Sequence, residues 1–136
     1  MVRAGFRSVT CTAESASDRV LMGMRKGFKR QQAVQVAKQF QHVGLRVFWM
    51  FLMGGPGENQ DTVEETLEFI HRETGPRDVA LIIYGIRVYP NTGMETVALE
   101  EGLIQQREEL LWPVFYMSPG LEHGWLKKRI NRAIRE

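Results

Sequence analysis

The chain has 136 residues, of which 43% are hydrophobic and 25% are charged, and its formal net charge is +2 at pH 7. This length corresponds to one domain and suffices to bury a core. The small net charge excludes strong attraction to nucleic acid, and a solvated helix face explains the basic residues between 127 and 135. The longest apolar runs, residues 47–53 and 79–88, fall far short of the roughly 20 residues that span a bilayer, so we also expect no membrane partner.

The cysteine and histidine content argues against disulfides and metal sites. Cys11 is the only cysteine, which rules out an internal disulfide and fits a reducing cytoplasm. No apolar run near the N-terminus has the length found in signal peptides, so we expect a cytoplasmic protein. We expect Cys11 to be a small buried strand residue. The three histidines, on predicted helices at unrelated spacing, predict no metal site.

The N-terminal part of the chain alternates strand and helix patterns. Residues 7–12 predict a strand, and residues 17–24 predict a short helix that ends before Gly27. Residues 29–43 have apolar side chains spaced three and four apart, which predicts an amphipathic helix ending at Gly44.

The same alternation continues through the middle of the chain. Residues 45–53 are continuously apolar after Arg46, as in a strand buried on both faces of a parallel sheet. Residues 61–73 predict a second amphipathic helix, with the spacing of a capping box at its start. Residues 78–88 are apolar and β-branched and predict a third buried strand.

The C-terminal part is less regular. Residues 94–101 predict a short helix, residues 105–120 contain two prolines and no clear period, and residues 121–135 predict a final helix. We therefore divide the chain into three βα units over residues 1–102 and an extension with a basic final helix over residues 103–136.

Strands that alternate with helices predict an α/β fold with right-handed crossovers and a parallel sheet. The carboxyl ends of such strands meet at one rim of the sheet, where ligands bind. Here those ends are residues 12–17, 53–58 and 88–92. A sheet of three strands leaves both of its edges without a partner.

The turn at residues 51–58 (FLMGGPGE) is the most informative of the three. Gly54, Gly55 and Gly57 lack a Cβ atom, so the backbone can adopt positive φ or lie close to a planar ligand. Pro56 fixes one φ angle. The alternative is that any α/β protein needs tight turns between strands and helices.

Together the three rim segments resemble the radical S-adenosylmethionine (SAM) enzymes, in particular the subgroup that often carries an upstream cobalamin-binding domain. Residues 9–17 (VTCTAESAS) and 20–27 (VLMGMRKG) resemble the family's fourth strand and following helix. Residues 51–58 resemble its fifth-strand G-x-I-x-G-x-x-E motif, and residues 88–92 (VYPNT) resemble the Y-P-G-T turn after its sixth strand. The resemblance covers roughly residues 4–102 and implies the second half of a partial TIM-type (β/α)6 barrel, followed by a C-terminal helical extension.

The resemblance also implies cofactor contacts, residue by residue. Glu14 and Ser15 match positions that bind the ribose hydroxyls or the amino-acid end of SAM, while helix capping is the alternative for both. Met53 matches an apolar residue that packs on the adenine, although core packing would also explain it. Gly54 and Gly55 match the place where backbone comes close to the cofactor.

The remaining implied site residues lie in the last two turns. Glu58 matches the motif carboxylate, which we expect to stabilise the turn and the N-terminus of the following helix. Tyr89, Pro90 and Asn91 match the final turn and would provide backbone and shape beside the adenine.

The sequence departs from the family pattern in two ways. Ala16, Phe51 and Asn91 stand where the family has glycines, and the last change is mild because asparagine tolerates the left-handed region. More seriously, the family holds a [4Fe-4S] cluster with C-x-x-x-C-x-x-C, and this chain has only Cys11. SAM and the cluster are therefore expected in the parent enzyme, and this chain alone should hold neither tightly and should be inactive. We assign it no catalytic or metal-binding residue.

Three functions remain open. The chain could be the C-terminal portion of an enzyme that cleaves SAM reductively to a 5′-deoxyadenosyl radical, contributing the ribose and adenine contacts. It could be a non-catalytic half-barrel that pairs with the missing N-terminal half of a barrel or with a second copy of itself as a homo-oligomer. It could also be a general nucleotide-binding α/β module.

Overall fold

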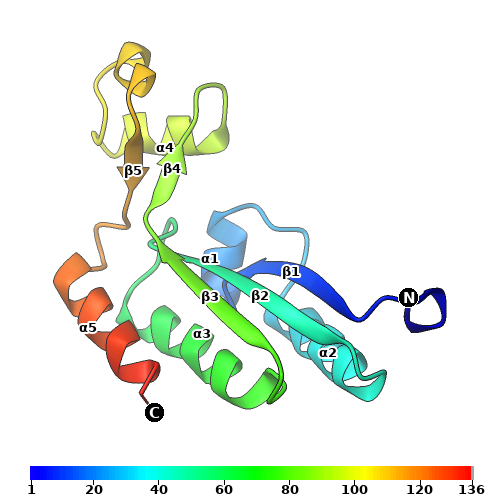
Figure 1. Cartoon of the computed structure of the whole chain (residues 1–136). Coiled ribbons are helices and arrows are strands. Elements are labelled where there is room, and N and C mark those ends of the chain that lie inside the picture. The colour runs from blue at the N-terminus through cyan, green and yellow to red at the C-terminus, as the bar shows by residue number, and fades with distance from the viewer. Residues whose placement is uncertain (136) are drawn as a thin grey trace.

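The centre of the structure, a computed structural model that describes residues 1–135, is a three-stranded parallel sheet (Figure 1). Its strands β1 (Ser8–Glu14), β2 (Arg46–Met53) and β3 (Val79–Tyr84) follow one another in space as they do in the sequence. Helices separate the strands along the chain, as parallel pairing requires. The predicted α/β fold with a parallel sheet is therefore confirmed.

Helices cover one side of this sheet. The chain between β1 and β2 forms α1 (Asp18–Gly23) and α2 (Arg30–His42), and α3 (Gln60–Glu73) joins β2 to β3. The C-terminal α5 (His123–Ala133) packs beside α3, so that α2, α3 and α5 lie along the same face (Figure 1). Among the described residues, no helix is long and apolar enough to cross a membrane.

The core forms where alternate side chains of β2 enter the helical layer. Trp49 and Phe51 are fully buried and contact Phe69 of α3, with ring centroids 5.6 and 6.0 Å from the Phe69 ring. Both contacts are edge-to-face, the arrangement that aromatic rings prefer. Cys11, which we expected to be buried, is half-buried against this cluster, and burial raises the pKa of its thiol.

The opposite face of the sheet is open, which corrects two predictions: that the strand at residues 45–53 is buried on both faces, and that the strand at residues 78–88 is buried. Phe48 is 39% exposed on β2, and Val79 is 53% exposed on β3. No element among residues 1–135 forms a second layer over this side. The apolar side chains of the open face are Phe48, Met50 and Leu52 of β2 with Val79, Leu81 and Ile83 of β3.

The predicted strand at 78–88 is also wrong in its length, because the chain turns at Gly85. This residue has a φ of +82° and donates its N–H to the Met53 carbonyl, which ends the pairing of β3 with β2. Beyond it, β4 (Ile86–Val88) pairs in antiparallel fashion with β5 (Val114–Tyr116). We call this two-stranded element the ribbon.

The ribbon has a small core of its own, separate from that of the main sheet. Helix α4 (Gly93–Glu100) packs against the ribbon. Short 3-10 turns form at Arg107–Leu111, between α4 and β5, and at Val2–Ala4, before β1. The region predicted to be irregular, residues 105–120, thus contains β5 and one of these turns. The buried side chains of the ribbon cluster are Val88, Ala98, Ile104, Leu110 and Tyr116.

The side chain of Asp78, just before β3, links the N-terminal half of β2 to the turn that precedes β3. The carboxylate of Asp78 accepts hydrogen bonds from the backbone N–H groups of Val47 and Gly75, both at 2.8 Å. It also accepts one from the Trp49 indole N–H at 3.2 Å. Trp49 itself is fully buried, so its indole N–H depends on this acceptor.

We predict that Asp78→Ala lowers the free energy of unfolding by about 1–3 kcal/mol, because it leaves the buried Trp49 N–H without an acceptor. Asp78→Asn keeps one acceptor oxygen and should cost less. Urea unfolding followed by circular dichroism measures both, with the exposed Glu100→Ala as a control. If Asp78→Ala costs no more than the control, the carboxylate does not hold these strands.

Candidate functional site

The glycine turn after β2 lies between α1 and the start of the ribbon. If Gly55 carried a Cβ atom, that atom would lie 3.2 Å from Val20 and from Met24 in and just after α1, and 3.5 Å from Ile86 of β4. The equivalent position at Gly93 lies 3.8 Å from the Arg25 guanidinium. The glycine turn therefore packs against α1 and against the start of the ribbon, and the turn after β4 lies near Arg25, two residues beyond α1.

Glu14, at the end of β1, has a strained backbone and a charged partner. Its φ is +63°, uncommon for a residue other than glycine, and the pairing with β2 shifts register between Thr12 and Glu14. The carboxylate forms an ion pair with Lys26 at 2.6 Å, with 13% of the side chain exposed. We did not single out Lys26 in the sequence, although it lies in the motif at residues 20–27.

Ser15 is buried, and its hydroxyl is used inside the protein. It lies 3.2 Å from the Thr66 hydroxyl of α3 and accepts the backbone N–H of Ser17 at 3.1 Å. The N–H of Ala16 donates to the same Thr66 hydroxyl at 3.1 Å. Ser15 thus anchors the end of β1 to α3, and its assignment to SAM stays a prediction.

The glycine turn is shaped by close packing within the protein. Gly54 has a φ of +100°, and a Cβ atom there would lie 2.6 Å from the Met117 sulfur. Met53, just before it, is fully buried among side chains of α3 and α5. Gly54 and Gly55 are buried as well, so in this turn a ligand would meet backbone at most.

Glu58 closes this turn from inside. One carboxylate oxygen accepts the N–H groups of both Gly54 and Gly55, which gives Glu58 the turn-stabilising role that the sequence suggested. The carboxyl is 1% exposed, and its other oxygen has no hydrogen-bond partner among the described residues. Burial raises its pKa, against the lowering effect of the two backbone hydrogen bonds.

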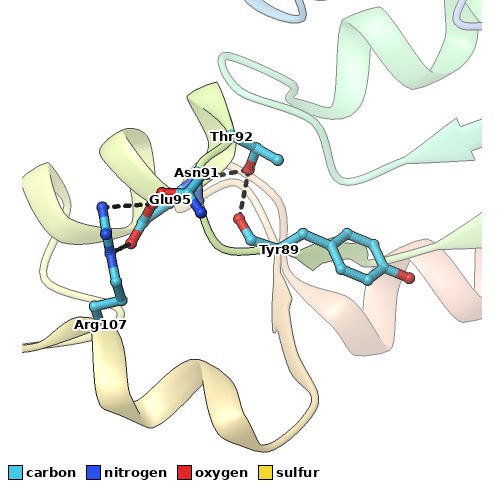
Figure 2. Close-up of polar contacts among 5 residues, drawn as sticks. All are labelled: Tyr89, Asn91, Thr92, Glu95 and Arg107. Atoms are coloured by element: carbon cyan, nitrogen blue, oxygen red, sulfur yellow. Dashed lines mark hydrogen bonds and ion pairs between the residues drawn. The ribbon is translucent and has the colours of Figure 1, made fainter.

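The turn after β4 is held by a second buried carboxylate (Figure 2). Asn91 has a φ of +60°, and its N–H donates to Glu95 at 2.7 Å. Thr92 donates its hydroxyl to the Tyr89 carbonyl at 2.7 Å, and Arg107 pairs with Glu95 at 2.5 Å. Glu95 and Arg107 were missed because their contacts bridge α4 and a later 3-10 turn.

The predicted site residues thus differ in what they offer to a ligand. Tyr89, Pro90 and Asn91 are exposed, and Glu14 is half-buried at the end of β1. The other five predicted residues are buried: Ser15, Met53, Gly54, Gly55 and Glu58. At the rim a ligand could therefore contact the Glu14 carboxylate and the exposed turn at residues 89–91, while the buried residues hold these groups in place.

The residues present do not fit an iron–sulfur cluster. Three cysteine thiolates would have to converge, and the chain has one cysteine. No group of three or more His, Cys, Asp or Glu side chains within residues 1–135 is arranged to hold a metal ion. A groove of about 940 Å³ lies away from the rim, between α3, β3 and α5, and none of the predicted site residues lines it.

Comparison with known proteins decides the family. A family model described as the Radical SAM superfamily matches residues 1–70, from the N-terminus into α3. The chain belongs to the radical SAM superfamily. This confirms the resemblance to the family, with two of the three rim segments inside the match, and implies SAM and an iron–sulfur cluster in a complete radical SAM enzyme. The match includes Glu14 and the glycine turn and ends before Tyr89.

The chain is also similar to a protein named as an uncharacterized methyltransferase, from Pyrococcus horikoshii. The two are 30% identical over 105 residues, which cover 76% of this chain and 22% of the relative. The radical SAM chain thus spans about a fifth of that relative's length.

The buried carboxyl of Glu58 gives a prediction for pH dependence. Because folding raises its pKa, the folded chain binds this proton more tightly than the unfolded chain does. The stability that this provides is complete below the unfolded pKa and is lost as pH rises through the folded pKa. Glu58→Gln removes the ionisation, so the free energy of unfolding of this variant relative to wild type should increase as pH rises above the pKa of an unfolded glutamate, about 4.3.

Urea unfolding at several pH values measures this difference, and Glu100→Gln, at an exposed site, is the matched control. A difference that stays flat with pH would show that Glu58 ionises as freely in the folded chain as in the unfolded one.

Proposed function

We propose that this chain is the C-terminal part of a radical SAM core, which contributes ribose and adenine contacts to SAM while a separate half supplies the [4Fe-4S] cluster. The parent enzyme would cleave SAM reductively to a 5′-deoxyadenosyl radical. The observation that carries the proposal is that α1 and the three residues after it contact Glu14, the glycine turn and the turn after β4, in a chain with a single cysteine.

Glu14 is the side chain best suited to the ribose. An ionised carboxylate accepts hydrogen bonds from two neighbouring hydroxyls, and Lys26 fixes its direction through the ion pair. The strained backbone at Glu14 is retained although it costs about 1–3 kcal/mol, which is typical of residues at functional sites.

The backbone of Tyr89, Pro90 and Asn91 would form the adenine side of the proposed site. They lie in an exposed turn whose backbone is fixed by Thr92 and Glu95. A fixed turn loses little conformational freedom when it binds a flat ring. The proposal assigns backbone and shape to these residues and no catalytic step.

The name of the Pyrococcus relative supports methyl transfer as the outcome of the parent reaction. We propose this for the parent enzyme only.

The partner that we propose is a cluster-bearing half-barrel or a second copy of the chain. The outer edges of β1 and β3 have no strand partner within residues 1–135, and unpaired edges favour further pairing. The apolar open face would be buried if a second layer or a closed barrel formed against it.

We predict weak nucleoside binding that depends on Glu14. Titration of the isotope-labelled chain with adenosine should shift backbone resonances at Glu14 and Asn91, and Glu14→Gln should weaken binding about tenfold, or ~1.4 kcal/mol. Lys26→Met breaks the ion pair but keeps the Glu14 carboxylate. Comparing it with Glu14→Gln therefore distinguishes the effect of losing the charged acceptor from the effect of losing its orientation.

Glu108→Gln, at an exposed position with the same charge change, should leave the binding unchanged. Micromolar affinity for adenosine would contradict a partial site and favour a complete nucleotide-binding module. No shift at Glu14 in any titration would sink the ribose assignment.

Pairing of the chain gives a separate prediction. If the open face drives association, the wild-type chain should self-associate in sedimentation velocity, and Leu81→Lys should yield monomers because it places a charge in the buried layer. Leu99→Lys is the matched control, since Leu81 is 38% exposed on the sheet and Leu99 is 40% exposed on α4. A wild-type chain that remains monomeric at every concentration would argue against a second copy as the partner.

A further inference from the structure

The exposed face of the ribbon combines one positive charge with two aromatic rings. Arg87 of β4 lies directly opposite Phe115 of β5 in the antiparallel register. Such opposed residues project to the same face, so their side chains are neighbours. The Tyr89 ring lies under the Arg87 guanidinium, 4.9 Å from ring centroid to the central carbon. Phe115 and Tyr89 are 58% and 52% exposed.

From this arrangement we propose that Arg87 binds a carboxylate of the substrate, while Tyr89 and Phe115 contact a planar ring of the same molecule. The inference rests on the proposed function, because it takes the carboxyl ends of the strands as the side where substrate binds. It adds to that function the chemical class of the substrate, a small planar molecule with a carboxylate.

The position of the ribbon suits this role. The Gly85 N–H donates to the Met53 carbonyl, and the Ser118 N–H donates to the Gly54 carbonyl at 2.9 Å. The start of β4 and the end of β5 therefore both lie beside the end of β2. Ile86 packs close to Gly55 in the glycine turn. The ribbon therefore begins next to the glycine turn through Ile86, and Arg87, the next residue of β4, projects from the opposite face of the ribbon.

The charge of Arg87 is unneutralised, in contrast to other polar groups of this region. Arg107 pairs with Glu95, and the Tyr116 hydroxyl donates to Glu101 at 2.8 Å. Within residues 1–135, no carboxylate lies within ion-pair distance of Arg87. A guanidinium that rests on a ring keeps its N–H donors and can bind a carboxylate with two parallel hydrogen bonds.

The surrounding charges favour a small ligand over a polyanion. Residues 86–116 contain five glutamates against two arginines, a net charge of −3. Nucleic acid, with its repeated phosphates, would be repelled by this region. A molecule with one carboxylate and an apolar ring matches Arg87 and its two aromatic neighbours.

The test uses two probes of nearly equal shape, 2-naphthoate and the neutral naphthalene-2-carboxamide, titrated into the isotope-labelled full chain. We expect 2-naphthoate to shift the Arg87 side-chain N–H and the backbone signals of Tyr89 and Phe115. The carboxamide should bind about tenfold more weakly, because it lacks the charge.

Arg87→Gln should weaken 2-naphthoate about tenfold, and Arg87→Lys, which keeps the charge but not the planar fork, should give an intermediate loss. Arg77→Gln is the matched control, because it changes the net charge equally. Arg77 is also exposed and lies just before the start of β3, at the end of the strand far from the ribbon. Circular dichroism verifies that each variant is folded.

Equal binding of the two probes, or an equal effect of the Arg77 and Arg87 variants, would overturn the proposal. It would also be overturned if Arg87→Gln weakened S-adenosylhomocysteine and left 2-naphthoate unchanged, because Arg87 would then serve the cofactor. Adenosine shifts at Glu14 report separately on the proposed function, so failure of one proposal leaves the other measurable.

Discussion

The one-sided burial of β2 determines how this chain can contact a ligand. Because side chains alternate along a strand, the residues that pack into the helical layer cannot also face the open side of the sheet. Trp49, Phe51 and Met53 all enter the helical layer, so Met53 offers no side chain to the open face. Any contact from this strand end to a nucleoside must then come from the backbone of the turn that follows.

The same constraint explains why the glycine turn needs a buried carboxylate. Once the side chain of Met53 is committed to the core, Gly54 and Gly55 turn sharply between α1 and the segment at Met117. Two N–H groups point inward there, and a buried N–H without an acceptor is costly. Glu58 accepts both, at the cost of burying a carboxyl group whose pKa rises in consequence. The turn is thus fixed from inside, independently of any ligand.

The sequence predicted the parts of the fold that depend on local pattern. The strand at 45–53, the helices around it and the parallel order follow from apolar runs, periodicity and short connections. The break at Gly85 could not be read from the apolar run 79–88, because pairing of the next residues with the distant β5 decides it. The partners of Glu14 and Glu95 were missed for a similar reason, since Lys26 and Arg107 lie 12 residues away in each case.

The break at Gly85 also separates the main sheet, which ends at the proposed nucleoside contacts, from the ribbon, which carries the proposed substrate contacts. A continuous strand would have to serve both. If the strand continued without a break through residue 88, it would stay in the main sheet beside β2. The last residue of β2 is Met53, which pairs with Tyr84. By leaving the sheet, the chain instead forms a ribbon with its own small core, and that core buries Val88 while Arg87 stays exposed. A ribbon supported in this way can vary its outer face without disturbing the packing around Trp49. The proposed nucleoside contacts at the sheet and the proposed substrate contacts on the ribbon could therefore vary independently of each other.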